Sequence, residues 1–170
     1  IYIDMLITFK NKDTLHFKNF FFKCAIGKNG LTFNKKEGDK KTPKGTYNLD
    51  RLYYRKDRIK KPKTKLNCIP ILKSMGWCDD VSNQKNYNKL IYINKKSKIK
   101  HEKMYRRNNN YDLVIPIKFN YKNTKLGKGS AIFIHVTKNY RSTAGCIALK
   151  KSDFLILIKL IDKNTKIKIT

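Results

Sequence analysis

Acidic residues are scarce in this sequence. Its 170 residues include 12 Asp and Glu against 40 Lys and Arg, which gives a formal net charge of +28. A field of this sign attracts nucleic acid, anionic lipid or an acidic polymer. However, the basic residues occur in short pairs along the whole chain, such as Lys35-Lys36, Lys95-Lys96 and Lys150-Lys151, and do not gather in one tail or on one helical face. We therefore expect no nucleic-acid partner, and either an acidic polymer or codon bias accounts for the charge.

Long apolar runs are also missing. The longest, from Phe154 to Ile161, is short and is interrupted by Lys159, so no transmembrane segment is expected. No signal peptide is visible, but the sequence begins at Ile1 and not at Met, which leaves open whether a targeting segment was removed. Apolar residues make up 40% and aromatic residues 12%, as in globular proteins. A chain of this length buries roughly 70% of its extended surface around one core, so we expect a single domain over residues 1–170.

Patterns of metal ligands are absent as well. The four cysteines, Cys24, Cys68, Cys78 and Cys146, form no CxxC pair, and the chain has only three histidines. A structural zinc site is therefore not expected, nor any other metal. In an exported protein two of the first three cysteines could form a disulfide, for instance Cys68 with Cys78, but the sequence does not fix that pairing.

The hydrophobic pattern predicts a mostly-β domain with one or two short helices. Strands are expected from Ile1 to Phe9 and over 15–26, 46–49, 90–93, 111–119, 131–136 and 167–169, with turns at Asn29-Gly30 and Gly127-Gly129. Pro116 reduces the 111–119 segment to an edge or bulged strand. A helix is expected from Asp153 to about Ile161 with Ser152 as its N-cap, and residues 53–65 as a polar surface excursion.

Trp77, the only tryptophan, is followed closely by two adjacent acids, Asp79 and Asp80, in a segment, 75–80, that is expected to form a loop. A tryptophan anchors a core more often than it binds a ligand, and paired acids are usually solvated or act as caps. The alternative is that Trp77, Asp79 and Asp80 line a substrate groove in which an acid meets an amine.

The residues from Ala131 to Leu149 carry the clearest chemical signal. A strand ends at His135, a polar loop of ten residues follows, and Gly145 precedes Cys146 at the start of another apolar run. A free thiol has a pKa of about 8.5, so an imidazole is needed to take its proton at neutral pH. Gly145 leaves no side chain beside the thiol, so backbone N–H groups of Gly145 and Cys146 could stabilise an oxyanion. The alternative is a buried structural cysteine and a strand histidine.

Two separated segments resemble the L,D-transpeptidase (YkuD-type) catalytic domain. His135 with Ser142-Thr143-Ala144-Gly145-Cys146 is similar to that family's His…[S/T]-x-G-C signature, and the loop from Gly38 to Tyr47 is similar to its G-D-x-x-T-P-x-G-x-[YF] segment. The similarity covers about residues 24–160 and looks closest to a subgroup common in α-proteobacteria. It implies a YkuD-like mixed β-sandwich in which Cys146 is the nucleophile and His135 the general base. The backbone of Ala144, Gly145 and Cys146 would form the oxyanion site.

Three positions depart from the family pattern. Many members have a second histidine two residues before the cysteine, where this chain has Ala144, so any role of that imidazole is absent here. Many also have Gly or Ser after the first histidine, where this chain has Val136, and Arg or Asn two residues after the cysteine, where it has Ala148. The departures leave the proposed nucleophile and base intact.

The resemblance implies an exported, monomeric, cofactor-free enzyme of peptidoglycan biosynthesis in the periplasm or cell envelope, and so a part in cell wall biogenesis and cell shape. Cys146 would form a thioester with a stem peptide and pass it to an amine, which makes a cross-link. An L,D-carboxypeptidase or peptidoglycan hydrolase would use the same thioester, and a non-catalytic basic module that binds polyanions is the alternative of another class. Arg141 and Thr143 are expected to bind substrate, Arg141 through a carboxylate.

Overall fold

The computed structural model describes residues 5–170, and most of its regular structure is strand. The strands are β1 (Leu6–Lys10), β2 (Thr14–Phe17), β3 (Phe20–Ala25), β4 (Leu31–Thr32), β5 (Thr42–Pro43), β6 (Gly45–Asn48), β7 (Leu52–Tyr54), β8 (Cys68–Pro70), β9 (Met75–Cys78), β10 (Leu90–Tyr92), β11 (His101–Lys103), β12 (Leu113–Pro116), β13 (Phe133–Thr137), β14 (Ile147–Lys150) and β15 (Lys166–Ile169). One α-helix occurs in the described residues, α1 (Lys151–Leu160), between β14 and β15. The prediction of a mostly-β single domain with a short helix is confirmed.

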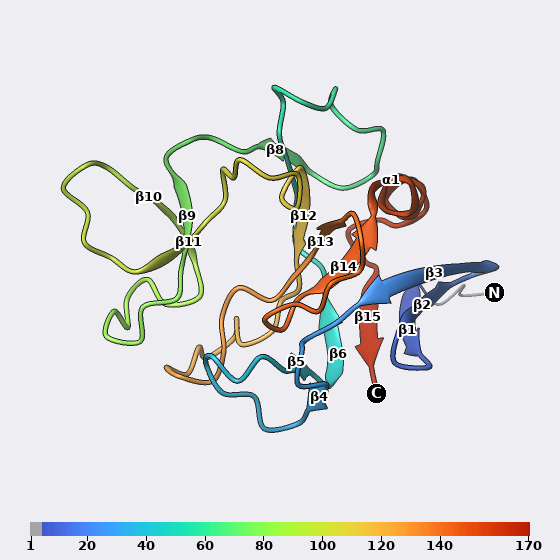
Figure 1. Ribbon diagram of the computed structural model, residues 1–170, viewed down its shortest axis with the longest axis horizontal. Coiled ribbons are helices and arrows are strands. Elements are labelled where there is room, and N and C mark those ends of the chain that lie inside the picture. The colour runs from blue at the N-terminus through green and yellow to red at the C-terminus, as the bar shows by residue number, and fades with distance from the viewer. Residues whose placement is uncertain (1–4) are drawn as a thin grey trace.

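Ten strands form one mixed sheet in the order β6-β15-β1-β2-β3-β14-β13-β12-β7-β8. In this sheet β1 with β15, β13 with β14 and β7 with β8 are parallel pairs, and the other neighbours are antiparallel. A three-stranded sheet, β10-β9-β11, and a two-stranded sheet, β4-β5, accompany it. Figure 1 shows the three-stranded sheet on one side of the molecule and the β1, β2 and β3 strands on the other.

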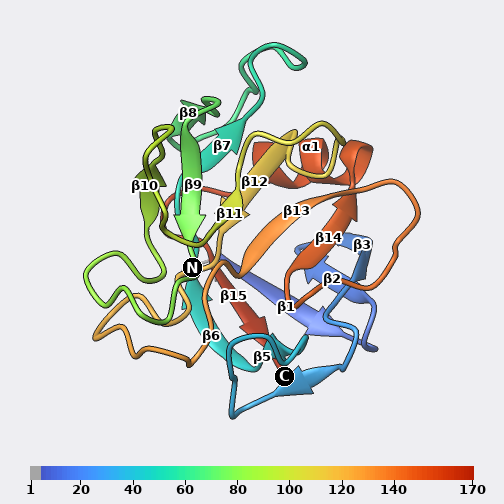
Figure 2. The same cartoon turned by 60° about the vertical axis from the view of Figure 1, so that its left-hand side comes forward.

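Two hydrophobic clusters lie on opposite faces of β13 and β14. Ile7 and Leu15, near one end of the large sheet, share the main core with Ile134 and Leu149, so the sheet folds over itself as a sandwich. Helix α1 packs on β13 and β14 and adds Phe154 to this core (Figure 2). Because strand side chains alternate, the next residues along β13 point away from this core. Phe133 lies in a second cluster with Met75 and Trp77 of β9, and His135 and Thr137 on the same face line the site described below.

The first and last strands agree with the sequence pattern. Ile7 and Phe9 of β1 are buried, and Ile167 and Ile169 of β15 are buried as well. Ile1 and Ile3, the first residues of the predicted N-terminal strand, lie outside the described residues. The turn at Asn29-Gly30 is also confirmed, since Gly30 N–H donates to Gly27 O and Gly30 has a positive φ of 79°.

Residues 15–26 are not one strand, as the pattern predicted, but belong to two. Strands β2 and β3 pair antiparallel, with Phe17 opposite Phe20, and Lys18 takes a positive φ of 53° in the tight turn between them. The turn consists of only two polar residues, Lys18 and Asn19, and aromatic residues resume directly after it with Phe20 and Phe21, although these are 41% and 66% exposed. The apolar residues on both sides of this short turn therefore hid the break.

The predicted loop at 75–80 is wrong for its first four residues. Met75–Cys78 is β9, the central strand of the three-stranded sheet, and all four residues are buried. Gly76 sits in this strand because the His101 ring of β11 fills the space of a side chain, where an added Cβ would lie 2.6 Å from His101 Cδ2. The surface excursion also begins later than predicted, because Tyr53, Tyr54 and Arg55 are buried. Figure 2 shows the projecting loop that follows β7.

The predictions of an edge position for β12 and of the N-cap residue of α1 are also wrong. Strand β12 is not an edge strand, because it pairs with β13 on one side and with β7 on the other. Pro116 is tolerated there because it is the last residue of β12, beyond the β7 pairing, and its carbonyl accepts the Asp50 N–H. Ser152 is not the N-cap of α1: β14 leads directly into the helix, so Lys150 is the N-cap and has no side-chain capping bond.

The disulfide between Cys68 and Cys78 is not formed. Cys68 lies in β8, at the edge of the ten-stranded sheet, and Cys78 lies in the centre of the three-stranded sheet. All four cysteines are free thiols.

Candidate active site

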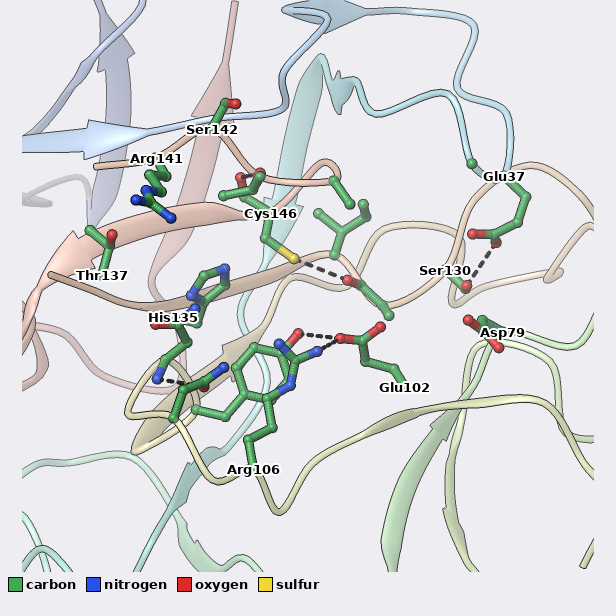
Figure 3. A pocket seen from close by; sticks show the side chains of 18 of the residues that line it. Glu37, Asp79, Glu102, Arg106, Ser130, His135, Thr137, Arg141, Ser142 and Cys146 are labelled. Atoms are coloured by element: carbon green, nitrogen blue, oxygen red, sulfur yellow. Dashed lines mark hydrogen bonds and ion pairs between the residues drawn. The ribbon is translucent and has the colours of Figure 1, made fainter. Parts of the chain in front are cut away.

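The pairing of β13 with β14 places Cys146 and His135 on one face of the sheet. His135 is opposite Ala148 and Ile134 is opposite Ile147, so Cys146, just before β14, lies opposite Phe133. Strands lie about 4.8 Å apart and rise about 3.3 Å per residue, so the diagonal from Cys146 to His135 is about 8 Å between Cα atoms. Both side chains point away from the main core, since alternate residues share a face. Figure 3 shows the sulfur and the imidazole entering the same space.

The Cys146 thiol is buried and neutral. Its Sγ donates to Ala131 O at 3.2 Å and accepts the Phe133 N–H at 3.4 Å. Burial raises the pKa of Cys146 to about 11, although the Phe133 N–H and the positive charges of Arg106 and Lys35 act in the opposite direction. A thiol with this pKa is protonated at neutral pH and needs a base to become a nucleophile.

His135 is also neutral, and its hydrogen bond fixes the tautomer. Its Nδ1 lies 2.9 Å from Val136 O, and because a carbonyl only accepts, Nδ1 carries the proton. Burial lowers the pKa of His135 to about 4, and the positive Arg106 lowers it further, while the Val136 hydrogen bond opposes this. Nε2 therefore keeps a free lone pair at neutral pH, as a general base requires.

A stack of three side chains supports the His135 imidazole, and the sequence pattern did not single out these three residues. The Tyr111 ring lies 5.3 Å from the His135 ring, and the Arg106 guanidinium lies 3.8 Å from the centre of the Tyr111 ring. Glu102 closes the stack: it accepts the Tyr111 hydroxyl at 2.9 Å and forms an ion pair with Arg106. Six of the 40 basic residues are Arg, and this scarcity was the one signal that could have marked Arg106.

Most of the predicted substrate-binding residues line one cleft of about 1060 Å³ that contains Cys146 and His135. Arg141, Thr143, Ala144 and Asp79 all line it. Figure 3 shows Arg141, Thr137 and Ser142 on one side of Cys146 and Glu37, Ser130 and Asp79 on the other. Arg141 therefore lies on one side of the thiol and the two carboxylates on the other, while Lys35 and Lys100 also line the cleft.

Trp77 and Asp80 do not line this cleft. Trp77 is 2% exposed, donates from Nε1 to Asn88 Oδ1 at 2.9 Å, and packs edge-on against the Phe133 ring. It thus supports, from behind, the strand residue whose N–H meets the Cys146 sulfur. Asp80 accepts the N–H and the hydroxyl of Ser82 and so closes a local turn.

Glu37 is a second cleft residue that the sequence did not indicate. Its Oε2 accepts the Ser130 hydroxyl at 2.7 Å and the Tyr87 hydroxyl. Asp79 lies at the same end of the cleft, and burial raises the pKa of Asp79, while the positive charge of Lys100 opposes this shift and the negative charge of Glu37 adds to it. Neither carboxylate has a Lys or Arg nitrogen within 4.0 Å in residues 5–170. The sequence signal for Glu37 was weak because a single Glu before a Gly also fits an ordinary turn.

The turn before Cys146 is held by side-chain hydroxyls. Thr143 Oγ1 accepts the Gly145 N–H at 3.1 Å and donates to Cys146 O at 2.6 Å. Gly145 has a φ of +137°, and an added Cβ would lie 2.8 Å from Lys41 O, so no other residue fits. The loop containing Thr42 and Pro43 therefore packs directly against the turn that carries the thiol.

Two other kinds of site do not occur in the described part of the chain. Within residues 5–170 no three His, Cys, Asp or Glu side chains come together as metal ligands would. No helix there has the length and apolar character to cross a membrane.

A mostly-β domain with a thiol and a neutral imidazole at the base of a long polar cleft has the features of a catalytic domain. Comparison with family models assigns the family: residues 5–169 match the YkuD family, the L,D-transpeptidase catalytic domain. Because the match spans almost the whole chain, the chain belongs to this family. Comparison with curated proteins and with solved structures found no match. The prediction of an L,D-transpeptidase-family domain that acts on peptidoglycan is therefore confirmed.

Proposed function

We propose that the protein is a peptidoglycan L,D-transpeptidase in which Cys146 is the nucleophile and His135 the general base. The observation that carries the proposal is the position of one neutral thiol and one neutral imidazole on the same sheet face, at the base of the cleft. A buried, neutral pair avoids the cost of holding separated charges until the substrate arrives.

In the first step His135 Nε2 takes the thiol proton while Cys146 Sγ attacks the carbonyl of a diaminopimelate residue in a tetrapeptide stem. The S–C bond forms, the C–N bond to D-Ala breaks, and His135 gives its proton to the leaving amine. In the second step the amine of a neighbouring diaminopimelate attacks the thioester. The new C–N bond closes the cross-link, the S–C bond breaks, and the proton of the attacking amine passes through His135 to the sulfur.

The oxyanion of each step would meet a backbone amide of the Ala144-Gly145-Cys146 turn. Gly145 N–H already donates to Thr143 Oγ1. We therefore assign the main role to the Cys146 N–H, with Ala144 as its neighbour on the cleft wall.

The charges of the cleft support an orientation for the two stems. Arg141 would bind a stem carboxylate, because a guanidinium binds both oxygens at once, with Thr143 beside it. Asp79 would meet the ammonium group of the acceptor at the other end. Trp77 would act only by packing against Phe133, and Asp80 only by closing a local turn.

Such a substrate lies in the cell envelope, so we place the enzyme in the periplasm or cell envelope. It would act as a monomer, because both reacting groups come from one chain. If water reaches the thioester before an amine, the same site is an L,D-carboxypeptidase or a peptidoglycan hydrolase. The net charge of +28 favours one other function, a non-catalytic module that binds acidic polymers.

Two measurements test the proposal. Treatment with a carbapenem, followed by intact-mass measurement, should give one covalent adduct, which Cys146→Ala loses while Cys68→Ala keeps it. Incubation with purified tetrapeptide muropeptides should give cross-linked dimers and free D-Ala. Absence of any adduct together with absence of turnover would favour the binding module, and tripeptides without dimers would identify a carboxypeptidase.

A further inference from the structure

The Thr42 hydroxyl joins the Thr-Pro loop to the turn that carries the nucleophile. Thr42 lies in β5 and is 0% exposed. Its Oγ1 donates to Gly145 O at 2.8 Å and accepts the Gly27 N–H at 2.9 Å. A hydroxyl has only one proton to donate. With these two backbone partners, the Thr42 O–H points to Gly145 O and its oxygen faces the Gly27 N–H.

This hydrogen bond fixes the plane of the peptide between Gly145 and Cys146. No cis peptide bond occurs in residues 5–170, so this peptide is trans, and its C=O and N–H point in opposite directions. Since the Gly145 C=O points to the buried Thr42, the Cys146 N–H points away from it. Cys146 lines the cleft and Thr42 does not.

The Cys146 N–H is also unoccupied. None of the hydrogen bonds among residues 5–170 uses it as a donor, whereas the neighbouring Gly145 N–H is taken by Thr143 Oγ1. Gly145 has no Cβ to restrict its backbone, so without an external contact this peptide could rotate. Thr42 provides that contact.

From this geometry, and resting on the proposed function, we infer that Thr42 is a positioning residue that aims the Cys146 N–H at the oxyanion of the acyl-transfer step. Thr42 touches neither the substrate nor the reacting sulfur. Its effect passes through the Gly145 carbonyl to the amide on the other side of the same peptide bond.

Two reactions at Cys146 separate this role from a general structural one. Iodoacetamide alkylates the thiol at a saturated carbon: the S–C bond forms, the C–I bond breaks and iodide leaves, the thiol proton passes to solvent, and no oxyanion develops. A carbapenem acylates it at a carbonyl: the S–C bond forms, the lactam C–N bond opens, the nitrogen takes the thiol proton, and an oxyanion develops. Only the second reaction needs the Cys146 N–H.

The test compares both rates, by intact mass, in the wild type and in Thr42→Val, which replaces the hydroxyl with a methyl group of similar size. We expect acylation to slow by about 10- to 100-fold, less than the about 10²–10³-fold that follows complete loss of an oxyanion donor, because the Cys146 N–H is misdirected and not removed. Alkylation should change by less than about 2-fold. Thr42→Ser, which keeps the hydroxyl, should restore most of the acylation rate.

Thr165→Val is the matched control. Thr165 is also 0% exposed, accepts the Asp162 N–H at 3.0 Å and lies outside the cleft, so its replacement should leave the ratio of the two rates unchanged. If Thr42→Val does not fold by circular dichroism, Thr42→Ala, which leaves room for a water, is measured under the same criteria. Wild-type acylation in the hydroxyl-free variant, or an equal fall in both rates, would overturn the inference. If iodoacetamide alkylates the wild type but the carbapenem never acylates it, the proposed function is overturned instead.

Discussion

The two faces of strand β13 are equally buried but chemically opposite. On the inner face Ile134 and Val136 are 0% and 3% exposed and lie in the main core with Leu149. On the outer face His135 and Thr137 are 8% and 7% exposed and line the cleft. One strand therefore contributes to the stability of the domain with one face and to the candidate site with the other.

Burial stabilises the apolar side chains of the inner face but disfavours ionisation of the polar side chains on the outer face. On the inner face it removes apolar area from water, which is favourable by about 25 cal/mol per Å². On the outer face it disfavours charge, so the pKa of His135 falls and the pKa of Cys146 rises. Backbone hydrogen bonds compensate both polar groups: His135 Nδ1 donates to Val136 O, and Cys146 Sγ donates to Ala131 O and accepts the Phe133 N–H. The outer face thus holds its reactive groups neutral at the expense of some stability.

His135→Asn should produce the largest effect, and only on the outer face. The Asn amide can still donate to Val136 O but has no basic nitrogen, so the thiol keeps its proton. We expect carbapenem acylation of Cys146 to fall by about 10²–10⁴-fold, the usual contribution of a general base, with little change in the circular dichroism spectrum.

The matched control is Thr137→Val, on the same face of β13 but without an ionisable group. It should retain acylation within a few-fold of the wild type. If His135→Asn acylates at the wild-type rate, His135 is only structural and another base must serve Cys146.

Ile134→Ala should show the reverse behaviour. Removal of a fully buried Ile side chain costs about 2–5 kcal/mol of the free energy of unfolding, which urea denaturation measures. Below the unfolding transition the acylation rate should remain close to that of the wild type, because Ile134 points away from the cleft. Ile156→Ala, at a position of α1 that is 40% exposed, is the control and should cost under about 1 kcal/mol. A variant that unfolds no more easily than the wild type but loses acylation would show that the two faces are not separable.

The burial of the inner face of β13 was predictable, because every residue of 131–136 except His135 is apolar. The outer face was predictable only in part. His135 and Cys146 stood out by residue type and by the Gly before the thiol, whereas their placement on one face depends on the parallel pairing with β14. The nine-residue connection between these parallel strands, 138–146, does not specify that register.

Contacts between distant segments account for most of what the sequence did not reveal. Thr42 is 103 residues from Gly145, and Glu102 and Arg106 approach His135 only through the Tyr111 ring. Trp77 was expected in a loop because Gly76 and two acids surround it, yet the packing of Phe133 against its ring overrides that local preference. Local patterns singled out the candidate residues His135 and Cys146, whereas the side chains that support them are brought together only by the tertiary structure.

A last expected effect is a pH dependence of stability that belongs to the outer face alone. Burial lowers the pKa of His135 to about 4, against an ordinary value of 6.5. Between these values the unfolded chain binds more protons than the folded protein, so stability rises with pH in this window. It is complete above about pH 6.5 and falls as the pH drops toward 4, by about 3 kcal/mol for a shift of this size.

Urea denaturation of the wild type and of His135→Asn across pH 4–7 isolates this contribution. Carboxylates titrate in the same range, but they are common to both proteins and cancel in the difference between the two curves. Cys146 does not contribute, because its pKa of about 11 keeps the thiol protonated throughout. The wild type should therefore lose stability relative to the variant as the pH falls, whereas Ile134→Ala should run parallel to the wild type. A flat difference between wild type and His135→Asn would mean that the imidazole is protonated as readily in the folded protein as in the unfolded chain, and that the outer face does not hold it neutral.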